Sequence, residues 1–188
     1  MANSSDSEAR RAVFLDRDGV INEVVYRDCK PGSPRHLTEF RFHNGIKGPL
    51  KQLRAAGYRL FIVTNQPDIA RGLLSRETLA ACHQMIIEQL PIEAVRLCPH
   101  DDRDDCECRK PRPGMLLQLA AETGVDLASS YFIGDTGKDA DTARAAGCKS
   151  VLLDRPYNRA NTADYRVLDM EEAAKVILRR ADKPSSSS

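Results

Sequence analysis

Short apolar runs alternate along the chain with longer stretches in which apolar residues recur every three or four positions. The short runs contain three to six residues, and polar residues or glycines bound them. Runs of this kind predict buried strands. The predicted strands cover residues 12–15, 58–63, 94–97, 131–133 and 150–153.

The longer stretches predict amphipathic helices. Ile46, Leu50 and Leu53 form one apolar stripe, and we expect Asn44 to cap that helix and Gly57 to end it. The other helices are predicted from similar signals at their ends. These signals are cap residues, a proline suited to a first turn and terminal glycines. These further helices are predicted at residues 75–89, 113–122, 136–147 and 171–180.

Alternation of strands and helices predicts an α/β fold with a doubly wound, mostly parallel sheet. Residues 11–182 are expected to form one domain, with disordered tails at 1–10 and 183–188. The short spacing between the polar motifs leaves no room for a large cap domain, so only loops would cover a site. In such sheets ligands bind beyond the carboxyl ends of the strands, so the residues at those ends are candidates for a binding site.

Composition narrows the range of functions. The 188 residues include 41% hydrophobic and 29% charged positions, with a formal net charge of +1. This balance is that of a globular protein and gives no general basic field for nucleic acid. No apolar run is long enough to span a bilayer or to act as a secretory signal, so we expect a cytoplasmic protein.

Two carboxylates follow the first predicted strand. In FLDRDGVIN, Asp16 and Asp18 are separated by one residue, and Gly19 comes next. One carboxylate can attack a phosphate ester and form an acyl phosphate, while the other donates a proton to the leaving oxygen and later removes one from water. Gly19 allows the chain to turn sharply close to a phosphate. A solvated Asp-Gly turn explains this segment, taken alone, equally well.

Three later segments add groups that suit the same chemistry. Thr64 could bind a phosphate oxygen through its hydroxyl, and Lys110 could neutralise charge on a transferring phosphoryl group. Asp135 follows the fourth predicted strand, and Asp139 comes four positions later. Asp16 and Asp135 could together hold Mg²⁺, which usually takes only one or two carboxylates. Each segment alone also fits an ordinary loop, so their combination at strand ends is what indicates phosphoryl transfer.

The order of these segments resembles the four motifs of the haloacid-dehalogenase-like (HAD) phosphatases. FLDRDG, VTN, RKP and GDTGKD occur in that order between residues 13 and 153. The resemblance implies a Rossmann-like core with Asp16 as nucleophile and Asp18 as general acid and base, whose backbone carbonyl also binds Mg²⁺. It further implies that Thr64 and Lys110 bind the phosphate and that Asp135 is the second Mg²⁺ carboxylate.

Further substrate contacts are expected around these motifs. Asn65 and Gln66 follow the threonine, and we expect them to bind substrate together with Lys110. Arg71 and Arg109 are expected to contact the remote end of a sugar phosphate, because a guanidinium binds phosphate through a fork of donors. Exposed arginines are often only solvated, which is the alternative for these two.

A cluster of cysteines indicates a second metal. Cys98, His100, Cys106 and Cys108 follow the spacing CxHx5CxC. Three thiolates and an imidazole match a closed, tetrahedral zinc site with a structural role. Clustered cysteines in a cytosolic chain favour metal over disulfides, because reducing pools keep thiols free. The alternative is free cysteines in a flexible loop.

The CPH…CxCRKP loop resembles that of two groups within the family, the heptose bisphosphate phosphatases and the histidinol phosphate phosphatases. DIARG at 68–72 and PGM at 113–115 favour the heptose group. The short gap before Cys106 is closer to the histidinol group, and Thr136 stands where the family often has lysine. The resemblance implies removal of the 7-phosphate of D-glycero-D-manno-heptose 1,7-bisphosphate, with histidinol phosphate or another small sugar phosphate as the alternative.

Two other classes of protein fit parts of the pattern. A receiver-type signalling module would also be doubly wound and accept a phosphoryl group on aspartate, but it would need neither Asp18 nor the zinc loop. A phosphosugar mutase would normally need a cap domain to exclude water. We therefore expect a monomeric enzyme with a small sugar phosphate as substrate, a catalytic Mg²⁺ and a structural Zn²⁺, and with no nucleic-acid or membrane partner.

Overall fold

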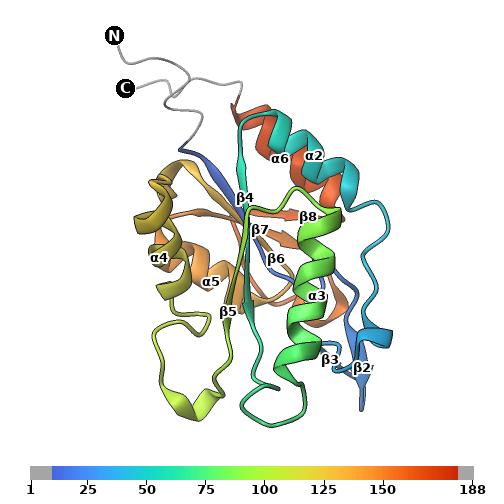
Figure 1. Cartoon of the computed structure of the whole chain (residues 1–188). Coiled ribbons are helices and arrows are strands. Elements are labelled where there is room, and N and C mark those ends of the chain that lie inside the picture. Colours follow the sequence, from blue (N-terminus) through green and yellow to red (C-terminus); the bar gives the residue numbers. More distant parts are fainter. Residues whose placement is uncertain (1–9, 182–188) are drawn as a thin grey trace.

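The computed structural model describes residues 10–181, whose centre is a parallel sheet of six strands (Figure 1). The strands lie in the order β5-β4-β1-β6-β7-β8, and every neighbouring pair is parallel. Their bounds are β1 Ala12–Leu15, β4 Arg59–Asn65, β5 Ala94–Cys98, β6 Tyr131–Gly134, β7 Lys149–Leu153 and β8 Tyr165–Val167.

Helices cover both faces of this sheet, which confirms the doubly wound α/β fold (Figure 1). Side chains point alternately to the two faces, so Val13 and Leu15 pack into one core and Phe14 into the other. The first core lies under α2, α3 and α6, and the second lies under α4 and α5. The helices are α2 Lys47–Ala55, α3 Arg76–Gln89, α4 Gly114–Thr123, α5 Gly137–Ala146 and α6 Met170–Ala181.

Smaller elements line the edge where the strands of the main sheet end. A hairpin of β2 (Val25–Arg27) and β3 (Lys30–Gly32) follows β1, and a 3₁₀ helix, η1 (Leu37–Glu39), comes next. Another 3₁₀ helix, η2 (Asp102–Asp104), follows β5, and η4 (Pro156–Asn158) follows β7. Among the described residues, no cap domain interrupts the core, as the motif spacing predicts.

The predicted strands and helices all occur, with ends that differ by up to three residues. The Ser75 hydroxyl accepts the Thr78 amide as the expected cap, and Gly124 and Gly147 end their helices in the left-handed conformation. Asn44 was the wrong residue as a cap, because α2 begins at Lys47 and its N-terminus has no side-chain cap. The sequence pattern did not predict β8, the β2–β3 hairpin or the 3₁₀ helices.

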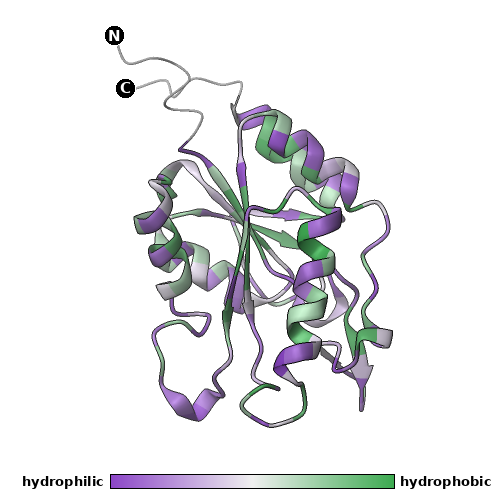
Figure 2. Ribbon diagram, in the orientation of Figure 1, coloured by the Kyte–Doolittle hydropathy of each residue, from purple (hydrophilic) through white to green (hydrophobic). Residues whose placement is uncertain are grey.

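Hydropathy follows this architecture, since the sheet strands are the most hydrophobic part of the chain and the loop around η2 is hydrophilic (Figure 2). None of the helices within residues 10–181 has the length and apolar character needed to cross a membrane. The predicted tails lie outside the described residues, apart from Arg10, whose carbonyl accepts a hydrogen bond from the Asp126 amide.

Candidate active site

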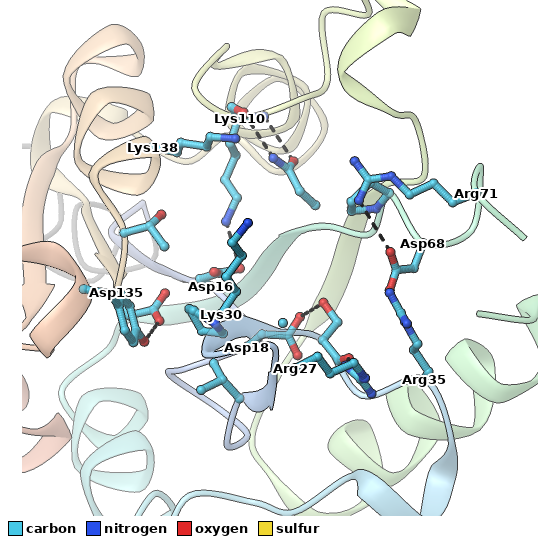
Figure 3. A pocket seen from close by; sticks show the side chains of 18 of the residues that line it. Asp16, Asp18, Arg27, Lys30, Arg35, Asp68, Arg71, Lys110, Asp135 and Lys138 are labelled. Atoms are coloured by element: carbon cyan, nitrogen blue, oxygen red, sulfur yellow. Dashed lines mark hydrogen bonds and ion pairs between the residues drawn. The ribbon is translucent and has the colours of Figure 1, made fainter. Parts of the chain in front are cut away.

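A cavity of about 580 Å³ lies beyond the carboxyl ends of the sheet strands (Figure 3). Its size suits a small-molecule ligand. The floor contains Asp16, Asp135 and Lys110, and the β2–β3 hairpin and the residues after β4 supply the walls. The parallel topology therefore brings the motifs found along the sequence to one place, because each of them follows a strand of the same sheet.

Lys110 links two carboxylates at the floor of this cavity. Its Nζ lies 2.8 Å from Oδ1 of Asp16 and 2.6 Å from Oδ1 of Asp139, and all three side chains are buried. Burial alone would lower the pKa of Lys110, but Asp139 and Asp16 raise that pKa above its usual range. Lys110 is therefore a fixed positive charge beside the Asp16 carboxylate.

Asp16 lies in an environment that opposes its charge. Burial raises the pKa of its carboxyl to about 7, and Asp139 and Asp18 add to this rise, while Lys110 counteracts it. Oδ1 of Asp16 also accepts the Arg17 amide at 2.7 Å. Added positive charge near this carboxylate would favour its ionised form.

Asp18 is held by donors from four other side chains. Arg17 reaches its carboxylate with Nε and Nη2 at 3.0–3.2 Å, and Asn22, Ser33 and Gln66 donate to it at 2.8–2.9 Å. Burial would raise the pKa of Asp18, but the Arg17 charge and these hydrogen bonds lower it below the usual value. The arrangement fixes Asp18 as a carboxylate in this structure.

The three residues at the end of β4 hold neighbouring groups in place. Gln66 Nε2 donates to Asp18 at 2.8 Å and to the Thr64 hydroxyl at 2.9 Å. Asn65 forms two hydrogen bonds of 3.1 Å with the backbone of Lys110, one to its carbonyl and one from its amide. Thr64 and Gln66 are buried, and of the three only Asn65 lines the cavity. Gln66 was predicted to bind substrate, but in this structure its amide donates to Asp18 and Thr64 instead of lining the cavity.

Asp135 has the features of a cation ligand. Its Oδ1 is buried without a hydrogen-bond partner, and Tyr157 donates its hydroxyl to Oδ2. Burial and the charges of Asp16 and Asp139 raise the pKa of Asp135 well above its usual value. Carboxylate oxygens of these three aspartates all lie within 4.8 Å of one another. Gly19 is required for this packing, because a Cβ there would lie 1.9 Å from Oδ2 of Asp135.

Asp139 differs from the other two aspartates because donors occupy both its oxygens. Oδ1 accepts from Lys110, and Oδ2 accepts the backbone amide and hydroxyl of Thr136 at 3.0 and 2.7 Å. These bonds cap the N-terminus of α5. A cation at this cluster would therefore find its free oxygens on Asp16 and Asp135, which fits the ligand pair expected from the sequence.

Both arginines expected to bind substrate line the cavity, but each is already paired. Arg71 donates from Nε and Nη2 to Asp101 at 3.0 and 2.5 Å. Arg109 donates from Nε to Asp102 at 2.8 Å and from Nη1 to the His100 carbonyl at 3.0 Å. Arg109 therefore joins the cysteine-rich loop to the cavity wall.

The predicted zinc ligands form one cluster. Cys98 Sγ lies 3.5 Å from both His100 Nδ1 and Cys106 Sγ, and Cys108 Sγ lies 3.3 Å from His100 and 3.4 Å from Cys106. Tetrahedral Zn²⁺ with Zn–S bonds of about 2.3 Å and Zn–N bonds of about 2.0–2.1 Å separates its ligand atoms by roughly 3.5–3.8 Å. The four donor atoms thus fit such an ion, and the loop packs closely on α4, where a Cβ at Gly114 would lie 2.3 Å from the Glu107 carbonyl oxygen.

Sequence reasoning missed several residues that contribute to this site. Arg17 is fully buried and holds Asp18, Ser33 reaches Asp18 from the loop after β3, and Tyr157 reaches Asp135 from η4. Of these three residues, only Arg17 could have been identified from the sequence, because it lies inside the FLDRDG motif. Ser33 and Tyr157 approach from loops whose positions depend on tertiary structure.

A doubly wound sheet with this arrangement of aspartates and lysine at its carboxyl edge defines a HAD-like phosphatase. The HAD-hydrolase-like family model matches residues 107–175. A solved structure of the D,D-heptose 1,7-bisphosphate phosphatase from B. bronchiseptica, complexed with magnesium and phosphate, is similar with a TM-score of 0.79 and 30% identity. The similarity covers 90% of this chain and 99% of that one.

Curated relatives identify the family more narrowly. The D-glycero-beta-D-manno-heptose-1,7-bisphosphate 7-phosphatase of Rhodopseudomonas palustris is 42% identical over 156 residues, which cover 77% of this chain and 83% of the relative. The enzyme of the same name from Photorhabdus laumondii is 32% identical, and the match covers 93% of this chain and 94% of that relative. The chain therefore belongs to the D-glycero-beta-D-manno-heptose-1,7-bisphosphate 7-phosphatase family of HAD phosphatases.

Proposed function

We propose that this enzyme hydrolyses a small phosphomonoester through a phospho-aspartate intermediate on Asp16. The contact between Lys110 and Asp16, at 2.8 Å on the cavity floor, carries the proposal. The Asp16 carboxylate attacks phosphorus, and the bond to the ester oxygen breaks. Water then attacks the acyl phosphate, which releases inorganic phosphate and restores Asp16. Lys110 and the Thr64 hydroxyl stabilise the negative charge of the transferring group.

Asp18 serves as the general acid and base in this scheme. It donates a proton to the leaving oxygen in the first step and accepts one from the attacking water in the second. The carboxylate must first take up a proton, because Arg17 and three hydrogen-bond donors hold it in the ionised form. Rearrangement of these donors when substrate binds would favour the protonated acid.

Asp16 and Asp135, with the backbone carbonyl of Asp18, are the groups that we propose hold Mg²⁺. The buried, unpartnered Oδ1 of Asp135 and the three crowded carboxylates support this assignment. Mg²⁺ held by these residues would neutralise charge on the phosphoryl group and would favour the ionised form of these carboxylates.

We likewise propose a structural Zn²⁺ at Cys98, His100, Cys106 and Cys108. Their four donor atoms lie within 4.8 Å of one another, and an ion held by all four would have no position left for water, as is typical of a structural site. The loop leads directly into Arg109 and Lys110, so its order would position the phosphate-binding lysine.

The substrate that we propose is D-glycero-D-manno-heptose 1,7-bisphosphate, from which the enzyme removes the 7-phosphate. The names of the relatives support this substrate, as do the DIARG and PGM segments. Histidinol phosphate is the alternative because of the short zinc loop. We further infer a cytoplasmic monomer with one domain over residues 11–182, which acts on small molecules rather than on nucleic acid or membranes.

The test is a phosphate-release assay with both anomers of heptose 1,7-bisphosphate and with histidinol phosphate. We expect the highest kcat/KM for one heptose anomer and release of many phosphates per enzyme. A higher kcat/KM for histidinol phosphate would contradict the substrate assignment. One stoichiometric, persistent phosphorylation without turnover would instead indicate a receiver-type protein.

A further inference from the structure

Arg17 is a charged side chain enclosed by the protein, with 1% of its surface exposed. It lies between Asp16 and Asp18 in the chain, and two of its three guanidinium nitrogens bind Asp18. Nε lies 3.2 Å from Oδ1 of Asp18, and Nη2 lies 3.0 Å from both carboxylate oxygens. The third nitrogen, Nη1, is not used by Asp18, and a buried donor without a partner costs free energy.

His83 on α3 supplies the partner for this third nitrogen. Its Nε2 lies 3.4 Å from Nη1 of Arg17. A guanidinium can only donate, so Nε2 must be the acceptor and the ring proton must lie on Nδ1. Burial and the Arg17 charge lower the pKa of His83 to about 4, which keeps the ring neutral at physiological pH. Nε2 therefore retains the lone pair that Arg17 needs.

Helix α3 gives His83 a fixed position. Cys82 and Ile86 on the same helix are buried and pack into the core under the sheet. Because a guanidinium is planar and rigid, a partner at Nη1 also fixes the direction of Nε and Nη2. His83 is thus connected to the Asp18 carboxylate through a single side chain, that of Arg17.

The position of Asp18 matters for the proposed chemistry. A general acid must lie within hydrogen-bond reach of the oxygen that it protonates. Misplacement of a group at the reacting centre by about 1 Å can cost about a hundredfold in rate. Arg17 contacts both oxygens of Asp18, so a guanidinium that turns away would release this carboxylate from its place.

We propose that His83 is a positioning residue, which holds Arg17 so that Asp18 stays aligned with the leaving oxygen of the substrate. This inference rests on the proposed function, because it assumes that Asp18 transfers the proton. His83 does not line the cavity, so it would act through Arg17 and not by contact with substrate. If His83 only filled space beside Arg17, the loss of its acceptor would not affect proton transfer in particular.

The experiment compares the hydrolysis of phenyl phosphate and p-nitrophenyl phosphate. The two esters are similar in size, but phenolate is the more basic leaving group and depends more strongly on a proton donor. The quantity compared is kcat/KM, since it reports the steps that lead to the first transfer of phosphate to Asp16.

The variants differ in whether they retain an acceptor. His83→Leu and the smaller His83→Ala both remove it, and the second serves if the first does not fold. His83→Gln retains an acceptor, because its amide oxygen can take the place of Nε2. Gln84→Leu is the matched control, since Gln84 is an exposed neighbour on α3 that does not line the cavity.

We expect His83→Leu to lower kcat/KM about tenfold for phenyl phosphate and less than about threefold for p-nitrophenyl phosphate. His83→Gln should stay within about twofold of the wild type for both esters, and Gln84→Leu should change neither. Arg17→Lys should also affect phenyl phosphate more strongly. Addition of His83→Leu to Arg17→Lys should cause little further loss, because both substitutions break the same connection.

A second measurement needs no turnover. It follows the Nε–H signal of Arg17 by nuclear magnetic resonance in protein labelled with ¹⁵N-arginine, and the signal is assigned by its loss in Arg17→Lys. We expect this signal to shift or broaden in His83→Leu and to keep its wild-type position in His83→Gln.

Equal losses for the two esters in His83→Leu, or an unchanged Arg17 signal in that variant, would overturn the role of His83. Failure of the proposed function has a different signature, in which the wild-type enzyme hydrolyses neither ester. The Arg17 signal would then still decide whether His83 holds Arg17.

Discussion

The Ser33 hydroxyl donates a hydrogen bond of 2.8 Å to Oδ2 of Asp18. Ser33 follows β3 directly, so this bond joins the β2–β3 hairpin to the proposed general acid. Arg27 strengthens the connection, because its guanidinium donates to the Ser33 carbonyl. A ligand that moves the hairpin would therefore also change the surroundings of the Asp18 carboxylate.

Ser33→Ala should lower kcat by roughly threefold to thirtyfold, because Asp18 would lose one of the donors that fix its position. Ser33→Thr retains a hydroxyl and should recover most of the rate. Thermal unfolding should show that both variants are folded. If Ser33→Ala and Ser33→Thr are equally impaired, the bond to Asp18 is not the cause.

Asp16→Asn should reduce kcat by a factor on the order of a thousand or more, since an amide cannot form the acyl phosphate. Brief incubation with ³²P-labelled substrate and acid quench should label the wild-type protein but not this variant. Asp141→Asn on α5 is the control, because Asp141 is exposed and pairs only with Arg144 among the described residues. Labelled Asp16→Asn protein would place the nucleophile elsewhere.

The sequence predicted the site residues that lie in short motifs at or after the carboxyl ends of strands. Asp16 and Asp135 directly follow β1 and β6, and parallel strand topology is enough to bring such residues together. Lys110 comes at the end of the cysteine-rich loop that follows β5, so its place also depends on that loop. Thr64 is predictable for the same reason as Asp16 and Asp135, and the cysteine spacing indicates a metal cluster because its ligands are close in sequence.

Other parts of the site depend on tertiary contacts that no local pattern reveals. Tyr157 lies 22 positions after Asp135 and reaches it through η4. The hairpin was missed because its turn is Asp28-Cys29 rather than the Asn-Gly that favours positive φ. The strand β8 has only three residues, Tyr165–Val167, and is too short to show a period.

Tyr157→Phe should raise the Mg²⁺ concentration for half-maximal activity by roughly tenfold, because the hydroxyl orients the Asp135 carboxylate. Chelation of the metal should abolish activity reversibly in both proteins. Binding of Mn²⁺, followed by electron paramagnetic resonance, gives a readout that does not depend on turnover and should weaken in parallel. Tyr26→Phe is the control, since Tyr26 is exposed on the hairpin. An unchanged metal requirement in Tyr157→Phe would refute this role.

Acid should destabilise the fold partly through His83. Burial and the neighbouring Arg17 lower the pKa of His83 to about 4. The unfolded chain, with a histidine pKa near 6.5, binds the proton first, so stability falls as the pH drops through 6.5 toward 4. The loss between pH 7 and pH 5 should be about 1–2 kcal/mol from this residue.

Urea unfolding of His83→Gln at pH 7 and pH 5 provides the measurement. The difference in unfolding free energy between the two pH values should be smaller than in the wild type by about the same 1–2 kcal/mol. His36→Gln serves for comparison, because His36 is exposed. A pH dependence that is the same in His83→Gln and in the wild type would show that His83 is not responsible.

Cys106→Ser should weaken catalysis although it removes no group from the cavity. The loop between His100 and Cys106 is polar and cannot order itself by burying apolar surface. Metal binding must then supply the free energy that orders it. Cys108 directly precedes Arg109 and Lys110, so a disordered loop would leave the phosphate-binding lysine poorly placed.

The expected defect is a raised KM with a smaller fall in kcat, together with loss of the one Zn²⁺ per chain that elemental analysis should find in the wild type. Cys29→Ser is the matched control, because Cys29 is an exposed thiol outside the cluster and its replacement should alter neither zinc content nor kinetics. Gly114→Ala tests the same connection from the other side, since a Cβ there would press on the Glu107 carbonyl and displace the loop from α4. An active wild-type enzyme that contains well under one equivalent of zinc would defeat the assignment, as would a Cys106→Ser variant with unchanged KM.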